Sequence, residues 1–179
     1  MHRYYAVYIR IDSEMIFIKM LNYIRFYFQL LLYKMIYGKK IIVGTASTWR
    51  KGMSVMIADQ GQITIGARCF FNNYCSINSL NKVEIGEGTI FGENVKIYDH
   101  NHRFSKNDED IKKQGYSIGQ VKIGKHCWIG SNVVLLKGSV IGDNCVIGAG
   151  CVVNGKIEPN SIVKANQNYI IEKISVGGK

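Results

Sequence analysis

The sequence predicts an all-β protein in which short parallel strands wind into a three-sided solenoid, preceded by one helix and opened by one long loop. Aliphatic residues recur at every sixth position over 123–157, and the same template covers 65–95. Glycine occurs 19 times against a single proline. The longest break in the repeat is a polar stretch at 101–120. A period of six fits neither an α-helix nor a hairpin, whereas it suits short strands joined by tight corners, three to a coil.

The repeat reads aliphatic, glycine, any, any, small, any, and predicts one domain over 41–168 with about five to six coils. The aliphatic residue is expected to point inward. Glycine, asparagine or aspartate is expected at the corners, because a tight corner needs positive φ. Neighbouring coils then stack at the strand spacing of about 4.8 Å. Residues 169–179 follow the solenoid as a tail.

The cysteines share one slot of this repeat. They are Cys69, Cys75, Cys127, Cys145 and Cys151, and each fills the small fifth position of a hexad. A metal site or a disulfide would have no reason to respect that register in two separate blocks. We therefore predict that the cysteines are small buried apolar residues and carry no chemistry.

The amino-terminal segment, residues 1–40, is not a repeat and predicts a helix over 14–38. A polar stripe on an otherwise apolar helix is formed by Lys19, Asn22, Arg25 and Gln29. Gly38 is the expected end. No charge-free stretch reaches the roughly 18 residues of a transmembrane helix. Two roles remain open: a cap on the first coil, which we favour, and an interfacial helix with basic residues at lipid headgroups.

The net charge of +10 indicates either simple solubility or attraction to phosphates or an anionic membrane surface. No basic stretch carries an interleaved recognition pattern, so nucleic acid is not an expected partner. The first residues lack the apolar run and cleavage site of a signal peptide. The expected location is the cytoplasm, with peripheral contact to the inner membrane face through residues 14–38 as an option.

Two places break the hexad register: "NSLNKVE" at 78–84 is a short corner insertion, and 101–120 is a long charged loop. A long loop leaving a regular solenoid usually carries function. His100 and His102 of "DHNH" stand where the repeat stops and this loop begins. In an arbitrary protein they would be solvated loop histidines. At the base of such a loop, an imidazole that is neutral at cytoplasmic pH can serve as a general base.

At this point the sequence resembles the hexapeptide-repeat acyltransferases, over about residues 41–165. The resemblance rests on the unbroken hexads and on "DHNH" followed, after the loop, by "CWIGSN" at 127–132. It implies a left-handed parallel β-helix, a homotrimer with active sites between subunits, and acetyl-CoA as co-substrate. In the galactoside and maltose acetyltransferase branch, a sugar hydroxyl attacks the thioester directly. The expected function is thus a sugar O-acetyltransferase in capsule, exopolysaccharide or lipopolysaccharide synthesis.

The resemblance also implies roles for single residues. His100 matches the general base, and the backbone N–H of Ser131 matches the oxyanion donor. The expected acceptor-binding residues are Asn73 and His102, and the expected coenzyme-binding residues are Trp128, Ser131, Ala149, Asn154 and Lys164. Asn73 could equally be a corner asparagine with positive φ. Asp99 is not expected to orient His100, because adjacent residues on an extended chain point to opposite sides.

The match weakens at the carboxyl end, where residues 161–174 lack the Gly-x-Pro turn and the arginine that many relatives use for the CoA 3′-phosphate. No metal is expected, since the histidines do not match the spacing of a zinc hydratase on this fold. Two alternatives stay open. One is an N-acyltransferase of an amino sugar or small xenobiotic, and the other is a non-catalytic β-helix scaffold.

Overall fold

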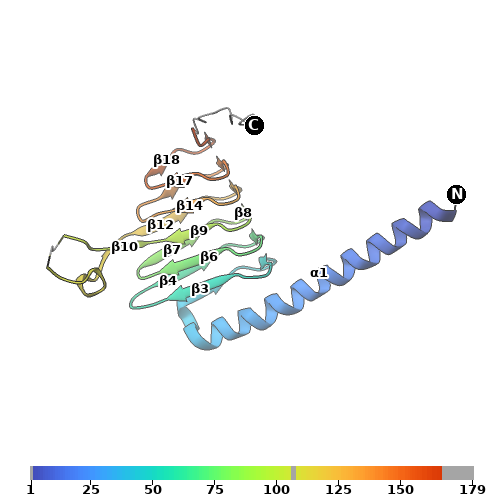
Figure 1. Cartoon of the computed structure of the whole chain (residues 1–179), viewed down its shortest axis with the longest axis horizontal. Helices are drawn as coiled ribbons and strands as arrows, with labels where there is room; N and C mark the ends of the chain where they lie inside the picture. The colour runs from blue at the N-terminus through green and yellow to red at the C-terminus, as the bar shows by residue number, and fades with distance from the viewer. Residues whose placement is uncertain (1, 106–107, 167–179) are drawn as a thin grey trace, which may run out of the picture.

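The structure, a computed structural model, describes residues 2–105 and 108–166, with side chains of the first helix from Met15 onward. The predicted tail at 169–179 lies outside the described residues. A long helix, α1 (His2–Tyr37), and a 3-10 turn, η1 (Gly38–Lys40), lead into a stack of coils (Figure 1). One hairpin projects from the middle of the stack and is built from β10 (His100–His102), η2 (Ile111–Gln114) and β11 (Tyr116–Ile118).

Three parallel sheets form the sides of the prism; the first five coils contribute one strand to each side, and the sixth contributes strands to sheets A and B among the described residues. Sheet A contains β1 (Ile41–Val43), β4 (Gln62–Ile65), β7 (Lys82–Ile85), β12 (Gln120–Ile123), β15 (Val140–Ile141) and β18 (Lys156–Ile157). Sheet B contains β2 (Thr48–Trp49), β5 (Phe70–Phe71), β8 (Ile90–Phe91), β13 (Trp128–Ile129), β16 (Val146–Ile147) and β19 (Ile162–Val163). Sheet C contains β3 (Ser54–Ile57), β6 (Ser76–Ser79), β9 (Lys96–Tyr98), β14 (Val134–Leu135) and β17 (Val152–Val153). The prediction of a left-handed parallel β-helix with an amino-terminal helix is confirmed, and the number of coils is six, at the upper end of the predicted five to six.

The core is the stack of inward-facing aliphatic residues that the hexad register predicted. Ile129, Leu135, Ile141 and Ile147 are all buried, as are all five cysteines, which are free thiols. The thiol of Cys127 lies 3.1 Å from the carbonyl oxygen of Gly142 in the next coil. Burial raises the pKa of Cys69, Cys75 and Cys127. The prediction that the cysteines pack in one structural slot is confirmed.

The prediction of positive φ at the repeat glycines is wrong for most of them. Gly124 and Gly142, which follow buried isoleucines, do not have positive φ. A Cβ on Gly124 would lie 2.6 Å from the backbone nitrogen of Asp143, and one on Gly142 would lie 2.4 Å from that of Pro159. These glycines therefore allow one coil to approach the next closely. Many of the corners with positive φ are instead occupied by asparagines: Asn94, Asn132, Asn144 and Asn160.

Helix α1 begins at His2 rather than near residue 14, and no proline or glycine interrupts the sequence before Gly38, where φ is +55°. Its second half lies against the first coil and meets the unpaired edge of sheet C. The Tyr33 hydroxyl accepts a hydrogen bond from the N–H of Val55 (3.2 Å) and donates one to the carbonyl of Met53 (3.0 Å). The Tyr37 hydroxyl donates to the carbonyl of Val55 at 3.1 Å. The helix thus satisfies backbone groups that an edge strand would leave exposed.

Candidate active site

The external loop replaces one tight corner between sheets C and A. The pairing of β14 with β9 places Leu136 beside Tyr98, and the pairing of β15 with β12 places Lys137 beside Gly119. Residues 99–118 therefore have no counterpart in the next coil. The insertion begins two residues earlier than the predicted 101–120, so that both Asp99 and His100 belong to it.

The two register breaks that are separate in the sequence meet at this corner. The pairing of β6 with β9 places Ser79 beside Asp99, so the short insertion stacks directly on the start of the long one. The Asp99 carboxylate accepts hydrogen bonds from the hydroxyl of Ser79 (2.7 Å) and the N–H groups of Leu80 (2.9 Å) and Asn81 (2.9 Å). The short insertion supplies the donors that allow a carboxylate to be buried here.

Asp99 is fully buried, with a side-chain exposure of 0%. Burial by itself would raise the pKa of this carboxyl, but the hydrogen bonds from Leu80, Ser79, His100 and Asn81 outweigh that effect and lower the pKa below its ordinary value. The carboxylate is therefore ionised at neutral pH and acts only as a hydrogen-bond acceptor.

His100 is held by this carboxylate. Its Nδ1 lies 2.9 Å from Oδ1 of Asp99, and its side chain is only 11% exposed. Because an ionised carboxylate can only accept, Nδ1 must carry the proton, which leaves Nε2 unprotonated in the neutral ring. Nε2 makes no hydrogen bond to any residue that the structure describes. A neutral Nε2 with a free lone pair is the protonation state that a general base requires.

The prediction that Asp99 does not orient His100 is wrong. Alternation of side chains holds along an extended strand, but β9 ends at Tyr98 and the chain turns at Asp99. The buried carboxylate lies beneath the corner, and the largely buried imidazole of His100 lies beside it. A bend at the end of a strand can therefore bring two adjacent side chains together.

The hairpin of the loop encloses the imidazole from the outside. Tyr116 of β11 packs edge-on against His100, with ring centroids 5.2 Å apart, and lies 4.6 Å from the ring of His102. Tyr116 was not predicted from the sequence, because only the antiparallel pairing of β10 with β11 brings it beside His102. His102 itself is exposed.

A second group of predicted residues lies at the corner between sheets B and C. It consists of Asn73, Ser131, Ala149 and Lys164, which follow β5, β13, β16 and β19. The hydroxyl of Ser131 accepts a hydrogen bond from the N–H of Glu93 at 3.1 Å. The N–H of Ser131 donates to no group within the described part of the chain. The positive φ at the first of these corners belongs to Tyr74 and not to Asn73, whose amide donates to Glu93 at 3.0 Å.

The outer face of sheet B is an apolar stripe beside this corner. It contains Phe70, Ile90, Trp128, Val146 and Ile162, which lie next to one another in consecutive strands. Trp128 is 55% exposed. Asn154 follows β17 and lies on the other corner, the one between sheets C and A that carries His100.

Within one chain, the corner that carries His100 and the corner that carries Ser131 lie far apart. Ser131 stacks beside Glu93, whereas His100 lies seven residues further along the same coil, across the whole width of sheet C. At strand rise this separation is roughly 20 Å. A general base must come within about 3 Å of the proton it removes. The described part of the chain also gathers no group of three histidine, cysteine or acidic side chains that could hold a metal ion.

Comparison with known proteins identifies the family. Residues 120–155 match the family described as bacterial transferase hexapeptide (six repeats). The chain is 30% identical over 129 residues to WbbJ of Escherichia coli K12, whose name assigns it to lipopolysaccharide biosynthesis as an O-acetyl transferase. That alignment covers 68% of this chain and 66% of the relative.

Solved structures agree in fold. A maltose O-acetyltransferase from Clostridium difficile 630 superposes with a TM-score of 0.54 at 31% identity, covering 66% of this chain and 64% of that one. A hexapeptide-repeat acetyltransferase of Vibrio cholerae, solved with acetyl coenzyme A, gives a TM-score of 0.63 at 22% identity over 74% of this chain and 69% of that one. The chain thus spans about two thirds of the length of each of these proteins.

The three-sided solenoid of hexads and the match of residues 120–155 to the hexapeptide family define the class of hexapeptide-repeat acyltransferases. The chain belongs to this family. The match of its repeats to the family model and its likeness to WbbJ and to the maltose enzyme show this.

Proposed function

We propose that this protein is an acetyl-CoA-dependent O-acetyltransferase that acts on a sugar hydroxyl in the synthesis of capsule, exopolysaccharide or lipopolysaccharide. The observation that carries the proposal is the pairing of His100 with the buried, ionised Asp99, which leaves Nε2 able to accept a proton. The names of the relatives, one assigned to lipopolysaccharide biosynthesis and another to maltose, support a sugar acceptor.

In the proposed reaction, Nε2 of His100 removes the proton of the sugar hydroxyl as its oxygen attacks the thioester carbonyl. The tetrahedral intermediate then collapses, the C–S bond breaks, and His100 returns the proton to the thiolate of coenzyme A. General-base catalysis of this kind contributes roughly 10²–10⁴-fold in rate. Asp99 acts as a positioning residue, since it fixes the tautomer and stabilises the imidazolium that forms transiently.

The oxyanion of the intermediate needs a donor, and we assign this role to the free N–H of Ser131. Because His100 and Ser131 are roughly 20 Å apart in one chain, the site requires His100 from one subunit and Ser131 from the next. A cyclic homotrimer of parallel prisms supplies that arrangement, with the part of the apolar stripe from Ile90 to Ile162 at the contact between subunits.

The remaining candidates divide between the two corners of this composite site. From the subunit that supplies Ser131, Trp128 and Ala149 would line the path of the pantetheine arm, Lys164 would meet the 3′-phosphate, and Asn73 would hold the acceptor. From the subunit that supplies His100 come His102, near the acceptor, and Asn154, near the adenine end.

The proposal is tested by incubating the purified protein with acetyl-CoA and a panel of sugars, and detecting acetylated products by mass spectrometry. We expect ester acetates, which mild hydroxylamine cleaves. Amide acetates, which persist in hydroxylamine, would mean an N-acyltransferase. His100→Asn should lower kcat by roughly 10²-fold or more, whereas His126→Asn, at a corner where φ is +54°, should leave kcat unchanged. Equal activity of wild type and His100→Asn would overturn the assignment of the base.

Subunit mixing tests whether the site is shared. Ser131→Pro removes the N–H together with the hydroxyl, and the turn should accept proline, because Pro159 precedes a positive-φ asparagine in another coil just as Ser131 precedes Asn132. Ser131→Ala keeps the N–H and serves as the control. Ser131→Pro and His100→Asn should each be inactive alone. Co-expressed in equal amounts, they should recover about a quarter of wild-type activity, because that fraction of sites combines two intact halves. No recovery would place both residues in one chain's site.

A further inference from the structure

Helix α1 presents its hydrogen-bonding face to the protein. Phe26 is buried against Trp49, with ring centroids 4.5 Å apart. The amide of Gln29 accepts a hydrogen bond from the indole N–H of Trp49 (2.9 Å) and donates one to the carbonyl of Met53 (2.6 Å). Part of the polar stripe seen in the sequence therefore faces the first coil rather than solvent.

The opposite face of α1 is apolar and exposed. Its residues recur at helical spacing along one side and are Phe17, Ile24, Phe28, Leu31 and Met35. Phe28 is 65% exposed and Met35 is 73% exposed. At 1.5 Å per residue this row is roughly 27 Å long. An unpartnered apolar row of this length indicates that another surface covers it.

The charges around the helix indicate what that surface is. Residues 15–58 contain no aspartate or glutamate. Their basic residues are Lys19, Arg25, Lys34, Lys39, Lys40, Arg50 and Lys51. A second copy of the same face would bring like charges together. An anionic lipid surface, in contrast, complements both the apolar row and the cations that flank it.

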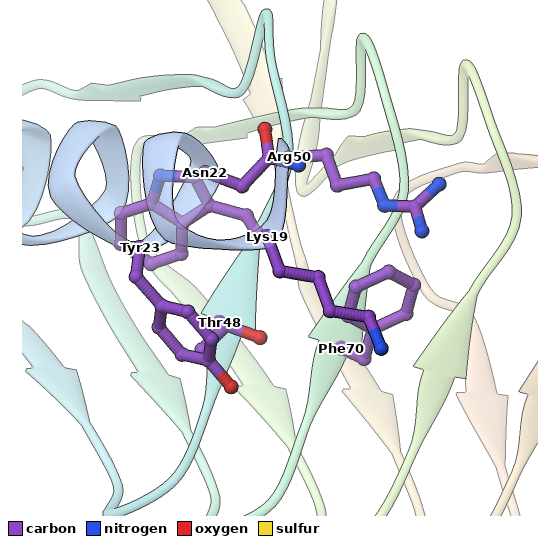
Figure 2. A pocket seen from close by; sticks show the side chains of 7 residues that line it. Lys19, Asn22, Tyr23, Thr48, Arg50 and Phe70 are labelled. Atoms are coloured by element: carbon purple, nitrogen blue, oxygen red, sulfur yellow. The ribbon is translucent and has the colours of Figure 1, made fainter. Parts of the chain in front are cut away.

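A cavity lies where α1 leaves the prism, at the side of the helix turned away from the apolar row. Figure 2 shows that Lys19 from the helix and Arg50 from the first coil extend over Phe70 of the second coil. The cavity has a volume of about 300 Å³, and the Arg50 guanidinium lies 5.4 Å above the Phe70 ring. Two cations beside one another are suited to the phosphate of a lipid headgroup.

The attachment of α1 to the prism decides how it meets a bilayer. By length and composition, Met15–Lys40 could cross a membrane. However, Phe26, Gln29 and Tyr33 hold its second half along the first coil, and Lys19, Arg25 and Lys34 interrupt its apolar sequence. A helix fixed along the end of a folded prism can lie on a bilayer but cannot cross it without leaving the prism (Figure 1).

We propose that α1 docks the protein flat on an anionic lipid bilayer, with the row from Phe17 to Met35 at the acyl boundary and Lys19 and Arg50 at the phosphates. This inference is independent of acetyl transfer, since membrane binding needs no substrate. It is tested with the full chain by flotation with vesicles of phosphatidylcholine, with or without phosphatidylglycerol. We expect binding to the vesicles with phosphatidylglycerol, weakened by salt.

Two sets of variants separate the apolar and the charged contributions. Ile24→Asp, Phe28→Asp and Leu31→Asp together should weaken vesicle binding roughly tenfold or more. Ile111→Asp, at an exposed isoleucine in the loop, is the control and should bind as wild type. Lys19→Gln with Arg50→Gln should weaken binding to phosphatidylglycerol vesicles only, whereas Lys122→Gln on sheet A should not. Urea unfolding midpoints establish that each variant is folded.

Three results would overturn the inference. The first is a wild-type protein that does not float with phosphatidylglycerol vesicles. The second is the triple variant binding vesicles normally while its mass in solution changes, which would make the apolar row a contact between subunits. The third is resistance of the bound protein to extraction with alkaline carbonate, which would mean that α1 spans the bilayer.

Discussion

Two crossings from sheet C to sheet A begin alike and end differently. After Leu135 of β14, the chain turns within four residues, and the buried Ser139 closes the turn by donating to the carbonyl of Leu136 at 2.6 Å. After Ile97 of β9, which stacks on Leu135, the chain instead leaves the prism at Asp99 and returns at Gly119. The same buried position therefore precedes both a tight corner and the loop that carries His100.

The difference shows what maintains each kind of corner. The tight corner depends on small side chains that fit inside it and on the close packing of neighbouring coils. The open corner depends on a buried carboxylate that accepts several hydrogen bonds. It also depends on hydrogen bonds at the base of the loop: the N–H of Gly119 donates to the carbonyl of Asp99 (2.7 Å), and the amide of Asn81 donates to the carbonyl of Gly119 (2.8 Å). A long loop thus leaves through a narrow, well-bonded base, which keeps His100 in place.

The largest loss of stability is expected from removing the buried carboxylate at the open corner. Asp99→Ala leaves the donors of Ser79, Leu80 and Asn81 without an acceptor in a buried corner, so the free energy of unfolding should fall by about 3 kcal/mol. Urea denaturation measures the change. Asp110→Ala, which removes an exposed ion pair with Lys113 in the same loop, is the control and should cost under about 0.5 kcal/mol. Similar losses for both would show that Asp99 does not anchor the corner.

The sequence predicts the tight corners much better than the open one, for a physical reason. A hexad is a local pattern, so Ile129 and Cys127 already reveal an inward side chain and a small slot, whereas the close approach at Gly130 becomes visible only when the coils are stacked. The bond between Asp99 and the insertion at Ser79 joins residues one coil apart, and no periodicity encodes it. Tyr116 and the separation of His100 from Ser131 likewise depend on how distant segments stack, which requires the three-dimensional structure.

A second variant changes a glycine in the regular part of the solenoid. Gly142→Ala would place a methyl group 2.4 Å from the backbone nitrogen of Pro159, which cannot move without separating two coils. We expect a loss of about 1–3 kcal/mol in the free energy of unfolding. Gly155→Ala is the matched control, because a Cβ there meets nothing within 4 Å and φ is not positive. If the two variants unfold at the same urea concentration, close stacking is not what the repeat glycines provide.

The buried charge should also leave a signature in pH dependence. The pKa of Asp99 is lowered in the folded state, so its contribution to stability is present above the unfolded pKa near 4 and is lost as pH falls through the lower folded value. Wild type should lose stability on acidification below about pH 4. Asp99→Asn should start less stable at neutral pH and show a shallower decline. Urea midpoints from pH 7 to pH 3 give both profiles, and parallel curves would contradict the lowered pKa.

The smallest effect is expected where the comparison predicts no chemistry, at the cysteine slots of the tight corners. Cys127→Ala removes one buried sulfur atom and its contact with the carbonyl of Gly142, at a cost of about 1 kcal/mol in the free energy of unfolding. It should leave kcat for acetyl transfer within about twofold of wild type, because a buried thiol with a raised pKa is a poor nucleophile. In the folded protein the five thiols should also react slowly with an aromatic disulfide reagent and become reactive on unfolding in urea. Rapid modification of Cys127 in the folded state, accompanied by loss of activity, would show that a cysteine of the regular repeat takes part in the reaction after all.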